Sequence, residues 1–283
     1  MAALSAYLGS TDGTISRAQL SDFPIGTDER RRLIDSSKGI WNPRDLAATL
    51  TILSSRDGPY ADQELDGGLF RYDYRAGSLA GDNTKLRRAY ELALPLILLH
   101  KIDAGVFMPI YPVYVLCDDQ ERRQFVLALD ESLRLLRDPL NPTADERRYA
   151  ERVVKQRLHQ PEFRVRVLRA YEMRCAVCSL RHARLLDAAH IVSDVETLGQ
   201  AIVPNGLTLC KIHHAAYDAD LMGITPDLTV QINEELLRET DGPMLEHGLK
   251  DMHGRVVTIP RRKADQPDRA RLDLRYRMFL AAG

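Results

Sequence analysis

Short hydrophobic runs alternate with polar turns between residues 58 and 130. The runs LFRYDY, LPLILLH, VFMPIYPVYVL and RQFVLALD are rich in β-branched and aromatic residues, and Gly- and Asp-rich segments separate them. This arrangement is typical of strands joined by turns. The segment NTKLRRAYELA has helical spacing and predicts one helix among the strands. We therefore expect a β-rich domain in this part of the chain.

Helical patterns flank the β-rich region. TDERRRLID, capped by Thr27, and a segment opened by Asn42-Pro43 predict two helices within the first 50 residues. ERRYAERVVKQRLHQ predicts a long helix after residue 145. The intervening DPLNPTADE carries two prolines and several turn formers, which favours a domain boundary there. The expected fold class is α+β, with one domain at 1–140 and a second at 141–283.

The composition is that of an ordinary folded protein. Among 283 residues, 45% are hydrophobic and 28% are charged, which argues against a disordered chain. The longest apolar stretch, Leu92 to Leu99, is interrupted by Pro95 and is far shorter than the roughly 20 residues of a membrane span. The N-terminus has no basic segment before its apolar run, so we expect no secretory signal, no membrane association and a cytoplasmic location.

Charge is distributed unevenly along the chain. A net charge of −1 argues against nucleic-acid binding by bulk charge alone. The window from Asp145 to Arg184, however, holds eleven Lys or Arg against five Asp or Glu. A solvated helix face with ion pairs is the simpler interpretation of such a run. A local binding surface for phosphates is the alternative.

Three of the four cysteines lie close together in the sequence. Cys175-x2-Cys178 has the spacing with which two thiolates hold one tetrahedral Zn²⁺, and Cys210-x2-His213 repeats that spacing with an imidazole. A redox pair or chance would explain a single Cys-x2-Cys, but not the second half-site. Four protein ligands leave no open position, so we predict a structural zinc. Cys117 stands alone in an apolar run and is expected to be a small buried hydrophobe.

The residues around this cluster carry a family resemblance. CAVC, LDAAHI and PNGLTLCKIHH resemble the HNH (ββα-metal) nucleases of restriction-type enzymes in both order and spacing. The resemblance implies that His190 is the general base and that His214 and Asp187 bind a divalent ion such as Mg²⁺ or Mn²⁺. It also implies that Asn205 pins the loop that orients His190, although a simple turn former is the alternative.

This chain departs from many of the family's members at two positions. His213 stands where many relatives have a fourth cysteine, which keeps a donor suited to zinc. Ala189 stands where many relatives have an acid directly before the base. Strand alternation places Asp187 on the same face as Ala189, opposite His190. Asp187 can therefore take the place of the missing acid as a metal ligand, or have no such role.

A basic helix that leads into an HNH core is expected to follow the DNA backbone. The resemblance therefore favours phosphate binding by the basic window over the solvated-face interpretation. The residues expected to contact phosphates are Arg164, Arg166, Arg169 and Arg174.

A second, shorter resemblance concerns residues 58–99. A tyrosine, an acidic turn, a second aromatic strand, Gly-Asp-Asn and a helix are similar to the SRA (YDG) domain, which flips a modified cytosine out of DNA. The resemblance implies an SRA/PUA-like barrel in which Tyr60 and Tyr72 stack on the base. Gln63, with Asp62 adjacent, stands where the family has its cytosine-reading aspartate. The alternative is that the tyrosines pack a β-barrel core and that Gly-Asp-Asn caps a helix.

Together these features predict a modification-dependent, type IV-like restriction endonuclease. It would recognise a modified cytosine in double-stranded DNA and hydrolyse phosphodiester bonds by a one-metal HNH mechanism. Cleavage of both strands predicts a homodimer. An HNH enzyme that reads unmodified DNA, and a non-catalytic zinc-containing DNA-binding protein, are the alternatives.

Overall fold

The computed structural model describes residues 1–54, 63–65, 69–74 and 81–282, the side chains of 63–65 excepted. The chain forms two compact units, Met1–Glu162 (unit 1) and Phe163–Gly283 (unit 2). Helices and strands mix in both units, so the α+β class is confirmed. In the described part of the chain, no helix is long and apolar enough to span a membrane.

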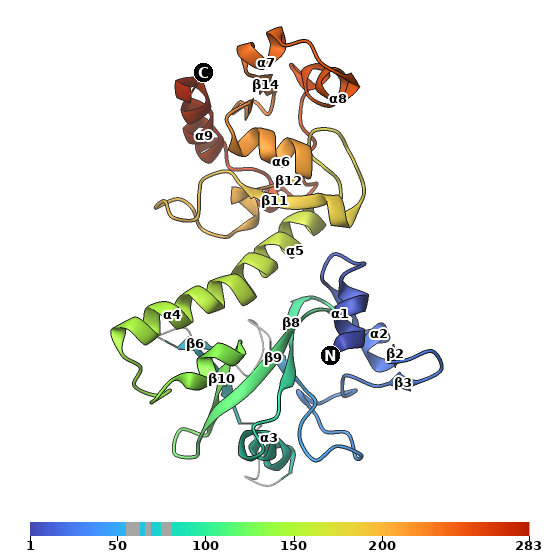
Figure 1. Ribbon diagram of the computed structural model, residues 1–283, viewed down its shortest axis with the longest axis vertical. Coiled ribbons are helices and arrows are strands. Elements are labelled where there is room, and N and C mark those ends of the chain that lie inside the picture. The colour runs from blue at the N-terminus through green and yellow to red at the C-terminus, as the bar shows by residue number, and fades with distance from the viewer. Residues whose placement is uncertain (55–62, 66–68, 75–80, 283) are drawn as a thin grey trace. The chain divides into compact units, whose positions relative to one another are not determined.

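Among its described residues, unit 1 is built on a sheet of eight strands. β9 (Val106–Asp119) pairs along its first half with β8 (Leu96–Asp103) and along its second half with β10 (Gln124–Ala128). The sheet therefore curls around β9 into a half-barrel (Figure 1). In order across the sheet, the strands are β4 (Ile40–Trp41), β5 (Thr51–Ser54), β8, β9, β10, β7 (Leu69–Asp73) and β6 (Gln63–Leu65), with β1 (Ile15–Ser16) paired to β9.

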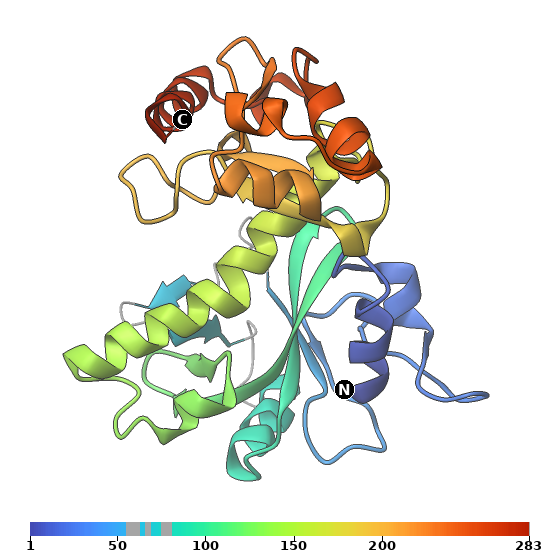
Figure 2. The same ribbon diagram turned by 45° about the horizontal axis from the view of Figure 1, so that its top comes forward.

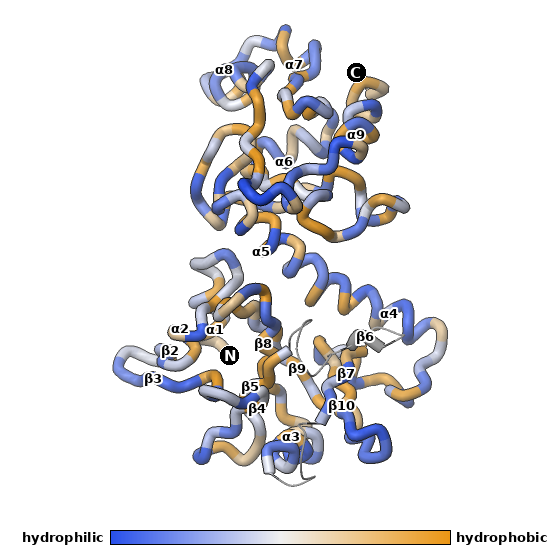
Figure 3. The backbone as a smooth tube through the Cα atoms, turned by 180° about the vertical axis from the view of Figure 1, so that it is seen from behind, coloured by the Kyte–Doolittle hydropathy of each residue, from blue (hydrophilic) through white to orange (hydrophobic). Residues whose placement is uncertain are grey.

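The strands follow the sequence pattern closely. β7, β8, β9 and β10 fall on the four hydrophobic runs, and those strand predictions are confirmed. The register between β8 and β9 shifts between Leu96 and Leu98. The facing part of β9 contains Pro112, which has no N–H to give to the ladder, so the irregularity falls where a regular pair cannot form. In the hydropathy colouring of Figure 3, the turn after β9 is hydrophilic, as its run of charged residues requires.

Helices lie around this sheet. α1 (Ala2–Leu8) packs on the early strands through Leu4, and the predicted helix at Gly-Asp-Asn is confirmed as α3 (Asp82–Glu91). α4 (Ala144–Val154) begins with a capping box between Thr143 and Glu146. Further helical segments described in unit 1 are α2 (Arg17–Ser21), the 3-10 helix η1 (Glu131–Leu135) and the π-helical turn η2 (Lys155–His159).

Both helices predicted between residues 27 and 50 are wrong. In 27–35 the described structure is the short strand β3 (Arg30–Arg31), paired with β2 (Phe23–Pro24). The Leu33 amide donates to Leu20 O, so a carbonyl from another segment takes the place of a helical partner. After Asn42-Pro43 the chain turns. Lys85 donates to the carbonyl oxygens of Pro43 and Leu46 at 2.7 and 2.9 Å, so a side chain satisfies groups that a helix would have bonded.

The boundary between the two units lies later in the chain than the boundary that the sequence predicts. Residues 141–162 follow the predicted boundary, yet Ala150 and Val153 of α4 pack in a core of unit 1 with Leu69 and Val126. The division falls within the helix α5 (Gln160–Ala170).

Unit 2 has a ββα arrangement at its centre. β11 (Leu186–His190) pairs antiparallel with β12 (Gly206–Cys210), and α6 (Lys211–Asp218) starts directly after β12. α6 lies along the β11–β12 pair in both ribbon views (Figures 1 and 2). The hairpin β13 (Met222–Ile224) and β14 (Val230–Ile232) follows, with α7 (Glu234–Arg238), α8 (Pro243–Gly248) and α9 (Arg269–Ala282).

Candidate metal centre and active site

Three cysteines and one histidine converge at the start of the ββα arrangement. One ligand atom from each of Cys175, Cys178, Cys210 and His213 lies within 4.8 Å of all the others. Nδ1 of His213 is 3.1 Å from the Cys210 sulfur and 3.4 Å from the Cys175 sulfur. Three soft sulfurs and one imidazole nitrogen at this separation suit a tetrahedral Zn²⁺.

Local backbone structure holds this Cys3His cluster in place. The Cys175 carbonyl accepts from the Ser179 amide at 2.9 Å, and the Cys175 amide donates to Leu180 O at 3.0 Å, which closes the tight turn between the first two thiols. Ser179 has φ of 62°, the left-handed conformation that such a turn needs. Cys210 ends β12, and His213 lies in the first turn of α6.

Because the four side chains of the cluster lie so close together, they change one another's pKa values. Hydrogen bonds with Cys178 and Cys210 raise the pKa of the Cys175 thiol. Hydrogen bonds from Cys175 and Cys178 lower the pKa of Cys210. Burial lowers the pKa of His213, but its bonds to the Cys175 and Cys210 sulfurs outweigh burial and raise the pKa to about 10. Zn²⁺ binds thiolates, so metal binding at this cluster would release the remaining thiol protons.

Asp187 and His214 meet on the side of β11 that faces α6. Nδ1 of His214 lies 3.6 Å from Oδ2 of Asp187, and Nε2 lies 3.3 Å from Oδ2 of Asp218. A carboxylate on the far nitrogen is the usual way in which a metal-binding imidazole is oriented. A carboxylate oxygen and an imidazole nitrogen can hold one divalent ion, with water and phosphate oxygens as the remaining ligands.

Basic groups surround Asp187. Lys211, the first residue of α6, donates to Oδ2, and Nε of Arg164 lies 3.5 Å from Oδ1. Burial raises the pKa of Asp187, while the Lys211 bond and the charges of Lys211, Arg164 and His214 outweigh it, so the pKa is lowered overall. Asp187 is thus a carboxylate in a positive environment, which also suits an incoming phosphate.

His190 ends β11 on the other face of the strand. Its imidazole stacks on the ring of Phe163, with centroids 4.1 Å apart and planes 18° apart. Its cross-strand neighbour is Gly206. The structure therefore brings Asp187 and His214 into contact but places His190 against α5, as strand alternation implies.

Asn205 is fully buried and bonds the loop after His190 from two sides. Its Oδ1 accepts from the Val192 amide at 2.9 Å, and its Nδ2 donates to the carbonyl oxygens of Val192 and Gln200 at 2.9 and 3.1 Å. The Asn205 carbonyl accepts from the Ile191 amide. Both ends of the side chain therefore bond to the 191–200 loop.

The four predicted phosphate-binding arginines have different environments. Arg164 donates to the carbonyl oxygens of Ala183 and Leu186 at 3.1 and 2.8 Å, which ties α5 to the start of β11. Arg174 pairs with Glu172 at 3.3 Å. Arg166 is half-buried and Arg169 is exposed on α5.

The predicted base-binding residues are only partly within the described chain. Tyr60 and Asp62 lie outside the described residues, and Gln63 is described only as part of the β6 backbone. Tyr72 lies on β7 and is 5% exposed, and its hydroxyl donates to Gly39 O at 3.3 Å.

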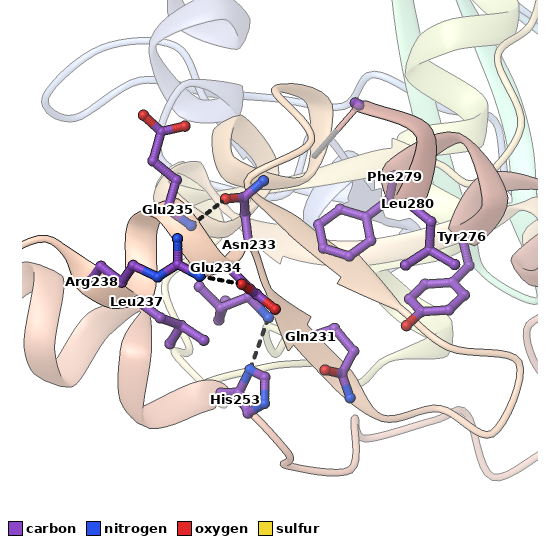
Figure 4. A pocket seen from close by; sticks show the side chains of 12 residues that line it. Gln231, Asn233, Glu234, Glu235, Leu237, Arg238, His253, Tyr276, Phe279 and Leu280 are labelled. Carbon is purple, nitrogen blue, oxygen red and sulfur yellow. Dashed lines mark hydrogen bonds and ion pairs between the residues drawn. The ribbon is translucent and has the colours of Figure 1, made fainter.

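A separate cavity of about 740 Å³ lies in unit 2 between β14, α7 and α9 (Figure 4). Tyr276, Phe279 and Leu280 of α9 line one side, and Asn233, Glu234 and Arg238 line another. It shares no lining residue with the Cys3His cluster or with the Asp187–His214 pair.

Lys211, Asp218 and Phe163 were not identified from the sequence. Lys211 directly follows a zinc ligand, and Asp218 lies one helical turn after His214, so both had a spacing signal. Phe163 had none, because its contact with His190 joins positions far apart in the sequence.

The ββα arrangement beside the Cys3His cluster agrees with a match to a family of nucleases. The HNH endonuclease family matches residues 175–225, which contain the cluster, β11, β12 and α6. The chain therefore carries an HNH endonuclease domain and is a metal-dependent DNA nuclease.

Seven chains of known structure match this chain. A modification-dependent restriction endonuclease, TagI, is 15% identical with a TM-score of 0.30, over 81% of this chain and 80% of that one. The type IV phosphorothioation-dependent restriction endonuclease ScoMcrA is 17% identical with a TM-score of 0.22, over 59% of this chain and 49% of that one. No curated protein matches the sequence. Because both TM-scores are low, the assignment rests on the family match and the geometry.

Proposed function

We propose that this nuclease is a modification-dependent DNA endonuclease in which unit 1 recognises a modified cytosine and unit 2 cuts. The observation that supports the catalytic half most directly is the 3.6 Å contact between Asp187 and His214, with Asp218 on the far side of the imidazole. It joins two residues from different elements into one ligand pair, which a purely structural zinc module does not need.

Each catalytic residue has a distinct task in this proposal. His190 takes the proton of the attacking water, because an imidazole exchanges protons near neutral pH. Asp187 and His214 hold a divalent ion such as Mg²⁺ or Mn²⁺. When bound, that ion neutralises charge on the scissile phosphate and the leaving oxygen. Asn205 keeps the loop after His190 in place through its bonds to Val192 and Gln200.

The Cys3His cluster has a structural task. Cys175, Cys178, Cys210 and Nδ1 of His213 would fill all four positions around Zn²⁺, so no position is left for substrate or water. The ion then fixes the turn before β11 to the start of α6, between which the catalytic residues lie.

We assign DNA contacts to both units. Arg166 and Arg169 would bind phosphates, while Arg164 and Arg174 support the surface through their internal bonds. In unit 1, the segment with Tyr60, Asp62 and Gln63 would read the flipped base. Tyr72, being buried, would form the wall behind it. The SRA-like sequence pattern supports this assignment, and the curled sheet is compatible with it.

We further propose a homodimer, since one HNH site cuts one strand and duplex cleavage requires two. The partner contributes a second copy of the same active site.

The decisive experiment uses the full-length chain with Mg²⁺ or Mn²⁺ and matched duplexes that are unmodified, methylated, hydroxymethylated or phosphorothioated. We expect cleavage of a duplex with modified cytosine, and about 10²- to 10⁴-fold slower cleavage by His190→Ala, which loses only the general base. Equal cleavage of all duplexes would leave an HNH nuclease that reads unmodified DNA. Cleavage by His190→Ala at the wild-type rate would refute the catalytic assignment.

A further inference from the structure

The imidazole of His190 lies flat against one aromatic ring. Phe163 is 3% exposed, and its ring is 4.1 Å from that of His190 with an interplanar angle of 18°. Phe163 comes from the first turn of α5, whereas His190 is the last residue of β11. A stacked contact of this kind restricts both side-chain torsions of the histidine, because rotation about either one would drive the ring into its neighbour.

β12, which pairs with β11 at His190, has no side chain where the Phe163 ring packs. Gly206 is the cross-strand partner of His190. A Cβ at Gly206 would lie 2.4 Å from Cγ2 of Val167 and 2.9 Å from Cζ of Phe163. The hydroxyl of Tyr171 donates to the Gly206 carbonyl at 3.3 Å. One face of α5 therefore meets the start of β12 at a position where only glycine leaves room.

We propose that Phe163 is a positioning residue for His190, and this rests on the proposed role of His190 as the general base. Phe163 fixes the imidazole in one orientation before DNA binds. The conformational entropy of the imidazole is therefore lost when the protein folds, and not when the reaction takes place. Its ring face also favours the imidazolium that forms once the base has taken its proton. Gly206 permits the contact by leaving the approach of α5 open.

Strand alternation makes this positioning necessary. His190 lies on the face opposite Asp187, which contacts His214 on the α6 side. His190 and the Asp187–His214 pair can act on the same phosphate only if the His190 imidazole is held toward the end of β11. The Phe163 ring covers one face of the imidazole and so sets its orientation.

The test compares three substitutions in the full-length protein: Phe163→Leu, Phe163→Tyr and Leu168→Ala. Leu168 is equally buried on α5, so Leu168→Ala is a matched loss of core packing. We expect Phe163→Leu to lower single-turnover kcat by about ten- to a hundredfold, with DNA affinity and zinc content unchanged. Phe163→Tyr keeps a flat ring and should retain most of kcat. Leu168→Ala should lower Tm with little effect on kcat.

A spectroscopic measurement follows the contact without relying on activity. In the wild type, the ring current of Phe163 should shift the His190 Hδ2 and Hε1 resonances upfield, assigned by their loss in His190→Ala. The shift should persist in Phe163→Tyr and vanish in Phe163→Leu. Wild-type kcat in Phe163→Leu, or equal losses of kcat in Phe163→Leu and Leu168→Ala, would overturn the proposal.

Failure of the proposed function gives a different pattern. If His190→Ala cuts at the wild-type rate while the upfield shift is present, the stack exists but holds no base, and both proposals are wrong. If His190→Ala is inactive and Phe163→Leu is fully active, only the positioning role is wrong.

Discussion

His213 donates a hydrogen bond from Nε2 to the main-chain oxygen of Gly248 at 2.8 Å. A carbonyl can only accept, so Nε2 keeps its proton, and Nδ1 is the nitrogen that faces the sulfurs of Cys175 and Cys210 and can bind a metal. The end of α8 is thereby linked to the cluster, and metal binding and the packing of the C-terminal part of unit 2 depend on each other.

Replacing Cys178 with serine should release the metal. We expect zinc content to fall well below one ion per chain and unit 2 to lose cooperative unfolding, because metal binding in such a cluster is part of the folding free energy. Hydrogen exchange should also increase in α8, through the His213–Gly248 bond. Cys117→Ser, which changes a free cysteine in unit 1, is the control. One full zinc per chain in Cys178→Ser would exclude the Cys3His site.

Replacing Lys211 with methionine should change the response to divalent ions. The Lys211 ammonium binds Asp187 where an ion would bind, so its removal takes away a competing cation. The metal concentration for half-maximal cleavage should fall roughly two- to fivefold, the size expected for one partly exposed ion pair. Lys263→Met removes the same charge from another element and should leave that concentration unchanged. A higher metal requirement in Lys211→Met would show that Lys211 supports the ion.

Sequence spacing was a good guide where neighbours in the sequence are also neighbours in space. The Cys3His cluster needs only two tight turns and one strand pair, so Cys-x2-Cys and Cys-x2-His were sufficient to find it. The strands of unit 1 followed from β-branched and aromatic runs. These are short-range signals.

Long-range contacts explain what the sequence did not reveal. The 27–35 segment has good helix formers, yet its amide at Leu33 donates to Leu20 O, and Trp41 Nε1 donates to Arg32 O, so tertiary bonds override local preference. Arg164 is predicted to bind phosphate, and nothing in the sequence indicates that its guanidinium also bonds carbonyl oxygens before and at the start of β11. Neither partner can be inferred from residues adjacent in the chain.

Asp130 should make unit 1 sensitive to acid. Burial raises the pKa of Asp130, but bonds from the Ser132 amide and hydroxyl and the charge of Arg157 outweigh it and lower the pKa. A lowered pKa contributes stability above the unfolded value of ~3.9 that is lost as pH falls through the folded value. Asp130→Asn keeps a capping side chain without the charge. Its deficit in unfolding free energy should be below about 1 kcal/mol at pH 7, because the carboxylate is a third exposed, and should disappear as the pH falls through the lowered pKa of the folded state. A deficit that does not change with pH would show that the charge is not involved.

Substitution of Tyr72 tests whether this side chain forms a base pocket or belongs to the hydrophobic core. Its ring is 5% exposed on β7, and Phe70, two residues earlier on the same face, is 4% exposed. If Tyr72 forms the wall of the pocket, Tyr72→Ala should weaken binding to modified DNA by roughly ten- to a hundredfold, as loss of one stacking aromatic does. Binding to unmodified DNA should change little, because that free energy comes from phosphate contacts. Tyr72→Phe should bind modified DNA almost normally, since it loses only the bond to Gly39 O.

Phe70→Ala is the matched control, because it removes a similar buried ring from the same strand. Affinities for paired modified and unmodified duplexes are compared at one salt concentration, below the melting temperature of each variant. Selectivity lost in Tyr72→Ala and kept in Phe70→Ala would assign Tyr72 to recognition. If both substitutions weaken both duplexes equally, Tyr72 is a core residue. Recognition would then depend on the 60–63 segment, where Tyr60→Ala applies the same comparison.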